Sequence, residues 1–420
     1  MNTSFKIPYL AHPHPCLADV NEVSLSDEDW LHGEYYTDIP TVEHMRHLMG
    51  PKSNAVRKDR SSVFFRSRQM QARNKLHLGI HDRAEEFSFA DGQVRESDLL
   101  NIRKHFPLPL KVFRYETMRL SSTEILDLTS SHKQWPALHY RSELYVYFHV
   151  NKLIIEPGAQ LVIHGNLLVF CCDEIIIDRK PSPNLFPGRP FDCQLSILGT
   201  KHFSVSRTKP RPAIDGLDGT NGANGITWHK ATETPSLFGP PPTKTTSDAD
   251  LTCTQNEQAT CGQDGGDGKD GTAGASGGMT MLADIRIGKL TNFLPNSFRI
   301  FTQAGTGNNG GNGGNGGNAG NGLPPGKGGV GGNGGIGGNG GLSSNIFVQI
   351  PEGCRQYFDI KTHNSIGGKG GKAGISGKNG RHSITGTNTS EAIHKSKAFQ
   401  GKDGRAREGA QVHFTILNQE

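Results

Sequence analysis

Residues 310–318 read GGNGGNGGN, and five further stretches of the chain carry glycine at every third position. A period of three matches neither the 3.6-residue period of an α-helix nor the two-residue period of a strand. It matches the left-handed extended helix of the polyproline II type, which rises about 3.1 Å per residue and has no internal hydrogen bonds. Each segment must therefore find hydrogen-bond partners for its backbone in neighbouring segments. The five further stretches are 216–225, 262–277, 326–341, 367–380 and 401–404.

The composition of the repeats separates three interpretations of this period. Collagen needs proline at about 15–20% of its repeat, whereas here only Pro324 and Pro325 interrupt the glycine pattern. A flexible glycine-rich linker does not need to keep a phase of three over six segments. A bundle of polyglycine-II-type helices needs both the phase and the excess of glycine, and it is the interpretation that we favour.

The number of glycines per triplet predicts the position of a helix in the bundle. A helix surrounded by neighbours must lack side chains on most of its surface. The Gly-Gly-Asn and Gly-Gly-Ile segments are therefore expected inside the bundle, and the Gly-Leu-Asp and Gly-Lys-Asp segments at its edges. Valine at an inward glycine should push helices apart, whereas Asn312 and Asn315 should tolerate serine if their ridge faces solvent. The predicted structural glycines are Gly313, Gly316, Gly334 and Gly337.

Apolar, strand-like segments follow most of the glycine runs, which indicates a folded core. In 411–417, Val412, Phe414 and Ile416 alternate with polar residues. We therefore expect a mainly β fold with a polyglycine-II-type helix bundle, in which short strands, solenoid-like or as a meander, are interleaved with glycine-rich extended helices. A small mixed or α-helical N-terminal region precedes them. The other predicted strands in the glycine-rich part are 279–287, 297–302, 345–350 and 357–361.

Three regions divide the chain. Residues 1–135 are expected to form a mixed, helix-leaning docking region, with one helix beginning near residues 25–31, a second behind Thr41 and a third within 92–105. Residues 136–206 hold closely spaced strand patterns and are expected to form a β platform. Residues 207–420 form the predicted glycine-rich bundle with interleaved strands, and the insertion 227–260 is an expected loop at its tip.

The glycine periodicity of residues 207–410 resembles that of three kinds of protein at the level of architecture. These are the glycine-rich tip adhesins of phage tail fibres, the snow-flea antifreeze proteins and the glycine-rich domain of Obg-type GTPases. The chain has no P-loop, which argues against a GTPase, and Asn, Lys and Asp stand where an antifreeze face needs apolar residues or Thr. The insertion 227–260 is similar to the variable receptor-binding loops of the adhesins.

No catalytic motif or metal-ligand spacing stands in a convincing context, so no catalytic residue, metal or cofactor is expected. The histidines around Cys16 are best explained as part of an N-terminal tail, and the charged residues 173–180 as a solvated turn, although a polysaccharide lyase would use such residues. Cys253 and Cys261 flank a polar loop and could form a disulfide in an oxidising setting.

Charge and hydropathy limit the partners and the location. The net charge of +5 does not itself indicate nucleic acid, and no stretch approaches a membrane span. Residues 52–75 hold eight basic residues against one acidic residue, which we interpret as a surface or subunit contact. The first residues lack a secretory signal, so the protein is expected in the cytoplasm or released and associated with a virion or particle.

Two classes of function follow, and the first is favoured. It is a non-enzymatic structural or binding protein, adhesin- or spike-like, whose rigid bundle presents loops to a receptor, a glycan or a partner subunit. The alternatives are a secreted toxin- or effector-like binding component and a polysaccharide-active enzyme on a β-solenoid. Open helix edges predict a homo-oligomer or a larger assembly. The candidate binding residues are Trp228, His229 and Phe238, at the predicted tip.

Overall fold

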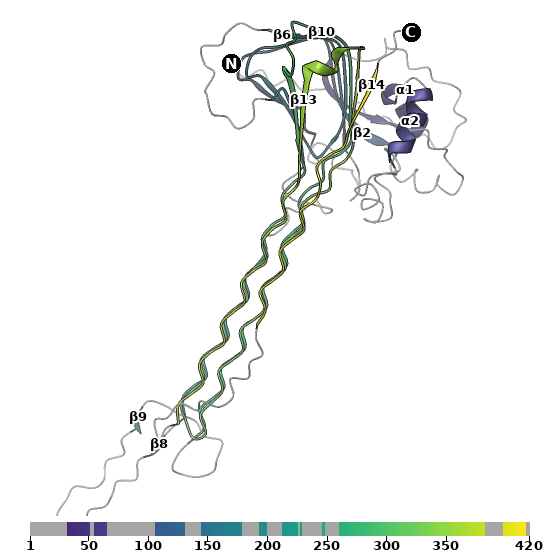
Figure 1. The fold of residues 1–420 in the computed structure, drawn as a ribbon. Helices are drawn as coiled ribbons and strands as arrows, with labels where there is room; N and C mark the ends of the chain where they lie inside the picture. Colours follow the sequence, from purple (N-terminus) through teal and green to yellow (C-terminus); the bar gives the residue numbers. More distant parts are fainter. Residues whose placement is uncertain are drawn as a thin grey trace, which may run out of the picture.

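Two β-sheets, at one end of a long glycine-rich shaft, organise the computed structural model of the protein (Figure 1). The structure describes residues 32–50, 54–64, 106–130, 144–178, 193–199, 212–225, 227–228, 246–247, 260–382 and 398–416. The larger sheet has the strand order β1 (Gly33–Ile39), β2 (Leu108–Leu120), β4 (Tyr145–Ile155), β6 (Leu167–Ile177), β10 (Ala283–Thr291), β12 (Ile346–Ile350), β14 (Val412–Ile416). The smaller sheet has the order β13 (Phe358–His363), β11 (Phe298–Gln303), β7 (Leu195–Leu198), β5 (Gln160–His164), β3 (Ile125–Asp127).

The chain alternates between the two sheets from β2 onward, so each coil adds one strand to each sheet. Among the described residues of the two sheets, β1 pairs with β2 antiparallel, and the other neighbouring strands run parallel to each other. Parallel neighbours require a crossover between them, and here the crossover passes through the other sheet.

The predicted fold class, a mainly β fold organised around a polyglycine-II-type helix bundle, is wrong. The chain has an α/β-type fold of two mixed or parallel sheets, with seven and five strands and very little helix. The physical reason is that burial of apolar side chains drives folding, and the glycine-rich segments have few such side chains to bury. A meander is excluded for the same strands, because neighbours in each sheet run parallel and are not consecutive in the chain.

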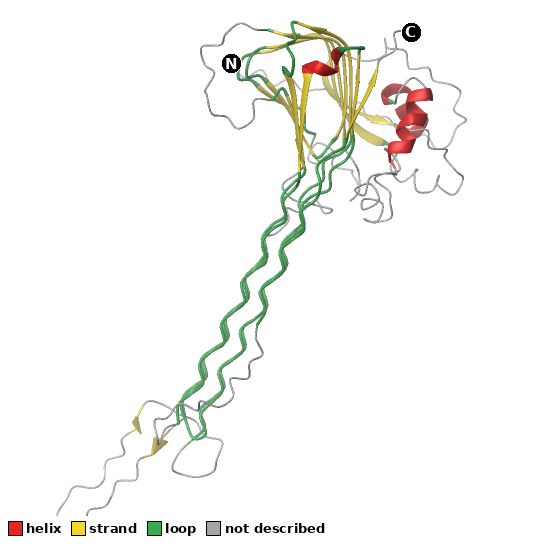
Figure 2. Ribbon diagram, in the orientation of Figure 1, coloured by secondary structure: helices red, strands yellow, loops and turns green. Residues whose placement is uncertain are grey.

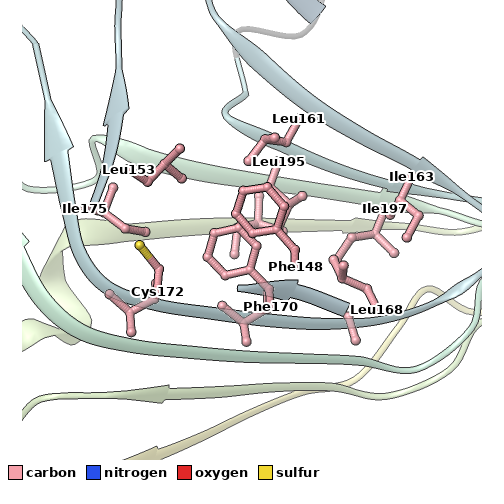
Figure 3. Close-up of a cluster of buried hydrophobic side chains, with 14 of the residues drawn as sticks. Phe148, Leu153, Leu161, Ile163, Leu168, Phe170, Cys172, Ile175, Leu195 and Ile197 are labelled. Atoms are coloured by element: carbon pink, nitrogen blue, oxygen red, sulfur yellow. The ribbon is translucent and has the colours of Figure 1, made fainter. Parts of the chain in front are cut away.

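The core between the sheets is built from in-register columns of side chains (Figure 3). Phe113, Phe148 and Phe170 are register partners on β2, β4 and β6, and the rings of Phe148 and Phe170 stack with centroids 4.8 Å apart. The column continues through Ile285, Val348 and Phe414. Strands that lie hundreds of residues apart thus share one apolar column.

The predicted strands 345–350 and 411–417 match β12 and β14 to within about one residue, whereas β10 begins four residues after the predicted start of 279–287 and neither β1 nor β2 is among the predicted strands. The helix predicted behind Thr41 is confirmed as α1 (Val42–Met49), and the Thr41 side chain accepts a hydrogen bond from the His44 N–H at 3.3 Å. The other helical elements of the described residues are α2 (Asn54–Phe64) and a 3-10 turn (Cys354–Tyr357). The helices expected near residues 25–31 and 92–105 lie outside the described residues.

The helices α1 and α2 cover the outer face of the larger sheet, where Met45 and Met49 join a second buried cluster with Tyr145 and Phe347 (Figure 1). Arg60 of α2 is 1% exposed and donates from both terminal nitrogens to the Asp284 carboxylate of β10, each at 2.9 Å. Its guanidinium lies 4.5 Å from the centre of the Phe347 ring. The basic stretch 52–75 therefore supplies a buried docking residue.

Asp284 is shared between two cations. Arg286 donates to Asp284 at 2.6 Å and also to the backbone carbonyl of Met49 at the end of α1. Burial alone would raise the pKa of Asp284, but the charges of Arg286 and Arg60 outweigh it and hold the pKa at about 2. The carboxylate thus stays ionised and links both helices to the sheet.

Arg60→Ala should detach the helical layer. Removing one partner of a buried pair leaves an uncompensated charge and typically costs about 3–5 kcal/mol. We expect thermal denaturation to show a markedly lower melting temperature than for Lys58→Ala, a matched change at an exposed position of the same helix. Equal melting of the two variants would show that the ion pair does not hold the helices in place.

Candidate functional site: the glycine-rich shaft

The shaft consists of three crossovers from the smaller to the larger sheet, each extended outward and back (Figure 2). The first excursion (212–225 and 260–278) lies between β7 and β10. The second (304–322 and 326–342) joins β11 to β12, and the third (365–382 and 398–407) joins β13 to β14. At about 3.1 Å per residue, the outgoing segment 304–322 spans about 60 Å.

Backbone hydrogen bonds in the shaft continue both sheets of the head. Outgoing segments bond to outgoing segments, as in the bond from the Gly216 N–H to the Asn312 carbonyl at 2.7 Å. Returning segments bond to returning segments, as in the bond from the Gly271 N–H to the Asn333 carbonyl at 2.8 Å. The order of segments in each layer is therefore the order of the strands from which they extend.

The two layers of the shaft are also bonded to each other, unlike the sheets of the head, which are separated by side chains. The Gly317 N–H donates to the Gly266 carbonyl and the Gly335 N–H to the Gly311 carbonyl, both at 2.8 Å. Such contacts require main chains to meet directly, which only glycine permits. The shaft is thus cross-linked within each layer and between its layers, which makes it stiff.

Each glycine column faces a neighbouring main chain. A Cβ atom added to Gly313 or Gly316 would lie 2.0 Å from the carbonyl oxygen of Gly332 or Gly329, and at Gly334 and Gly337 the corresponding distances are 2.0 and 2.1 Å. One column of the third excursion carries glycine at some positions and larger residues at others. Gly367 and Gly370 face carbonyls of its returning segment, while further along the column carries Ala373 and Ser376.

A ladder of Asp and Asn side chains joins neighbouring segments along the outside of the shaft. The Asp215 Oδ1 accepts a hydrogen bond from the Asn312 N–H at 2.6 Å, and the Asn312 Oδ1 accepts one from the Lys372 N–H at 2.9 Å. The rung repeats every three residues, as in Asn221 to Asn318 to Lys378. The returning layer has equivalent rungs, such as Asp270 to Asn333 to Phe399.

These rungs correct the expectation for the asparagines. Asn312 and Asn315 are exposed, as a solvent-facing ridge requires, yet each amide oxygen is the acceptor for an N–H of the third excursion. Serine is too short to replace that contact, so its substitution carries a cost. The sequence carries a signal for this ladder: in separate segments, Asp or Asn residues directly precede the glycines and keep the same three-residue phase.

Of the three predicted binding residues, the structure describes the position of Trp228. Trp228 belongs to β8 (Thr227–Trp228), which pairs with β9 (Thr246–Ser247) at the end of the shaft away from the sheets (Figure 1). His229 and Phe238 lie outside the described residues, as do the histidines near Cys16. Cys261 is disulfide-bonded, and its predicted partner Cys253 also lies outside them.

The carboxylates near residue 174 take part in cross-strand pairs. Glu174 accepts from the Thr291 hydroxyl at 2.6 Å and pairs with Lys289 at 3.0 Å, and these contacts hold the pKa of the Glu174 carboxyl below its ordinary value. Asp178 pairs with Arg119 at 3.2 Å. Arg179 and Lys180 lie outside the described residues. Residues 173–177 thus belong to the interior strand β6 rather than to the expected solvated turn, and Glu174 joins this strand to β10.

The function of the chain must be inferred from its geometry, because comparisons with known proteins found no match. No family model, curated protein or solved structure matches the chain.

Within the described residues, no three His, Cys, Asp or Glu side chains are grouped so that they could hold a metal ion. No described helix is long and apolar enough to cross a membrane.

Gly313→Ala should destabilise the shaft, because its methyl group would overlap the Gly332 carbonyl and overpacking typically costs about 1–3 kcal/mol. Leu217→Ala is the matched control, since Leu217 is 75% exposed on the same shaft. Scanning calorimetry should show a lower transition for Gly313→Ala only. Equal transitions for both variants would rule out close main-chain packing at this column.

Proposed function

We propose that the protein is a non-enzymatic structural or binding protein with a spike-like or adhesin-like shape. In this proposal, the shaft presents the loops at its far end to a receptor, a glycan or a partner subunit. The observation that carries it is the continuity of hydrogen bonding from both sheets into the shaft, which holds the tip at a distance of about 60 Å from the head.

The chemistry of the shaft supports a mechanical role. Its interior consists of glycine main chain, and its outer Asx side chains accept N–H groups of neighbouring segments. Each such bond contributes modestly by itself, on the order of 1 kcal/mol. Their regular repetition in two directions resists bending and separation of the segments, as a support for a distant binding surface requires.

The tip is the part of the shaft best suited to recognition. Loops on a rigid scaffold are common sites of binding, because the scaffold fixes their position. The strands β8 and β9 pair at the far end of the first excursion, and the sequence there supplies Trp228, Phe238 and a Pro-Pro-Pro run at 240–242. Aromatic side chains with polar neighbours suit contact with sugars or with a protein groove.

Deletion of residues 230–258 tests this function. We expect the full chain to bind at least one class of glycan on a glycan array, and the deletion variant to lose that binding while its calorimetric transition is unchanged. A variant in which a Gly/Ser linker of equal length replaces these residues should behave like the deletion variant. Retained binding without the loop, or cleavage of a uronic-acid polymer by the full chain, would overturn the proposal.

A further inference from the structure

The two outer excursions of the shaft carry opposite charge. The described part of the first excursion holds five acidic side chains and one basic side chain, Lys269. Within residues 365–382 and 398–406, the third excursion holds six exposed basic side chains and one acidic side chain, Asp403. The acidic edge consists of Asp215, Asp218, Asp264, Asp267 and Asp270, and the basic edge of Lys369, Lys372, Lys378, Arg381, Lys402 and Arg405.

These edges lie on opposite sides of the shaft, because the second excursion separates them. In the outgoing layer, Asn312 accepts from Lys372 of the third excursion and donates to Asp215 of the first. In the returning layer, the Asn333 N–H donates to Asp270 of the first excursion and its side chain accepts from the Phe399 N–H of the third. Each rung thus runs from the acidic edge to the basic edge.

Both edges have the same spacing. Their charged residues recur at multiples of three residues, which is about 9 Å along an extended segment of this type. The ladder uses one carboxylate oxygen, Oδ1, of each Asp. Exposed apolar side chains accompany the charges on both edges. Leu217 lies between Asp215 and Asp218, and Ile375 lies between Lys372 and Lys378, while Ile214, Ile366 and Phe399 precede the first charged residue of their segments.

We propose that a second copy of this chain packs alongside the shaft, with its basic edge against the acidic edge of the first copy. Charges of matching period can pair along the contact, and the intervening apolar side chains lose their exposure to water. An anionic polymer would fit the basic edge alone. A second copy fits both edges, because each is complementary to the other.

The topology determines the direction of the second copy. The strands β1, β2 and β4 extend the larger sheet beyond β6, on the side of the first excursion, and therefore overhang the acidic edge. Two heads at the same height would collide there. An antiparallel arrangement of the two shafts, with the heads at opposite ends, avoids this collision and is the arrangement that we propose. Because the contact joins two different edges, it can also extend to further copies.

Sedimentation velocity of the full chain at low ionic strength tests the contact. We expect self-association that weakens at least about tenfold at 1 M salt, where the screening length falls to about 3 Å. An acidic-edge variant (D215N, D218N, D264N, D267N, D270N) keeps the ladder, because Asn221 and Asn224 occupy equivalent rungs of the same segment. A basic-edge variant carries the neutralising changes K369Q, K372Q, K378Q, R381Q, K402Q and R405Q. Each variant alone should be monomeric.

Mixing the two variants provides the decisive outcome. Each retains the edge that the other lacks, so an equal mixture should form one-to-one dimers that do not grow, with heads at opposite ends in electron micrographs. A control with K58Q and E352Q, at exposed positions outside the shaft, should associate like the unmodified chain. A monomeric unmodified chain, a mixture that stays monomeric, or retention on heparin without self-association would overturn the proposal.

Discussion

An extended segment with three residues per turn cannot satisfy its own backbone, and the rest of the structure depends on this constraint. In the head, strands solve the problem by pairing in two sheets, and side chains fill the space between them. In the shaft the same two layers continue, but without side chains between them, so their main chains bond directly. Head and shaft are thus two forms of one coiled path, which differ in what lies between the layers.

The constraint explains the sequence of the shaft position by position. A glycine is needed wherever a neighbouring main chain lies, which is why the second excursion, between the other two, has two glycines in most triplets. An Asp or Asn is used where an outward N–H of the next segment needs an acceptor. The use of Asp at these acceptor positions gives the first excursion its acidic edge, whereas exposed positions of the third excursion carry the basic residues.

Local patterns in the sequence predicted local structure well. Alternation located β14, and the capping side chain of Thr41 located α1. The fold class was wrong because it depends on pairings that no local pattern encodes. The ladder joins residues 97, 63 and 60 positions apart, and Arg60 reaches Asp284 across 224 positions. A lone arginine within a basic stretch gives no sign that its partner is buried in a distant strand.

In the candidate site, too, local features could be predicted from the sequence and long-range pairings could not. The glycines could be assigned from their period, whereas the partner of each glycine required the order of the strands. The role of Trp228 at the tip remains a prediction, because its strand is placed at the end of the shaft but its binding partner is not shown by the fold.

Native-state hydrogen exchange resolved along the chain tests the central claim most directly, since exchange reports which amides are bonded and how they open. The amides of Gly313, Gly314 and Gly317, all bonded to neighbouring segments, should exchange as slowly as those of β10 and β12 and should lose protection together with them in denaturant. Exchange of these glycine amides at the rate of an unfolded chain, while β10 and β12 stay protected, would show that the shaft is not a hydrogen-bonded continuation of the sheets.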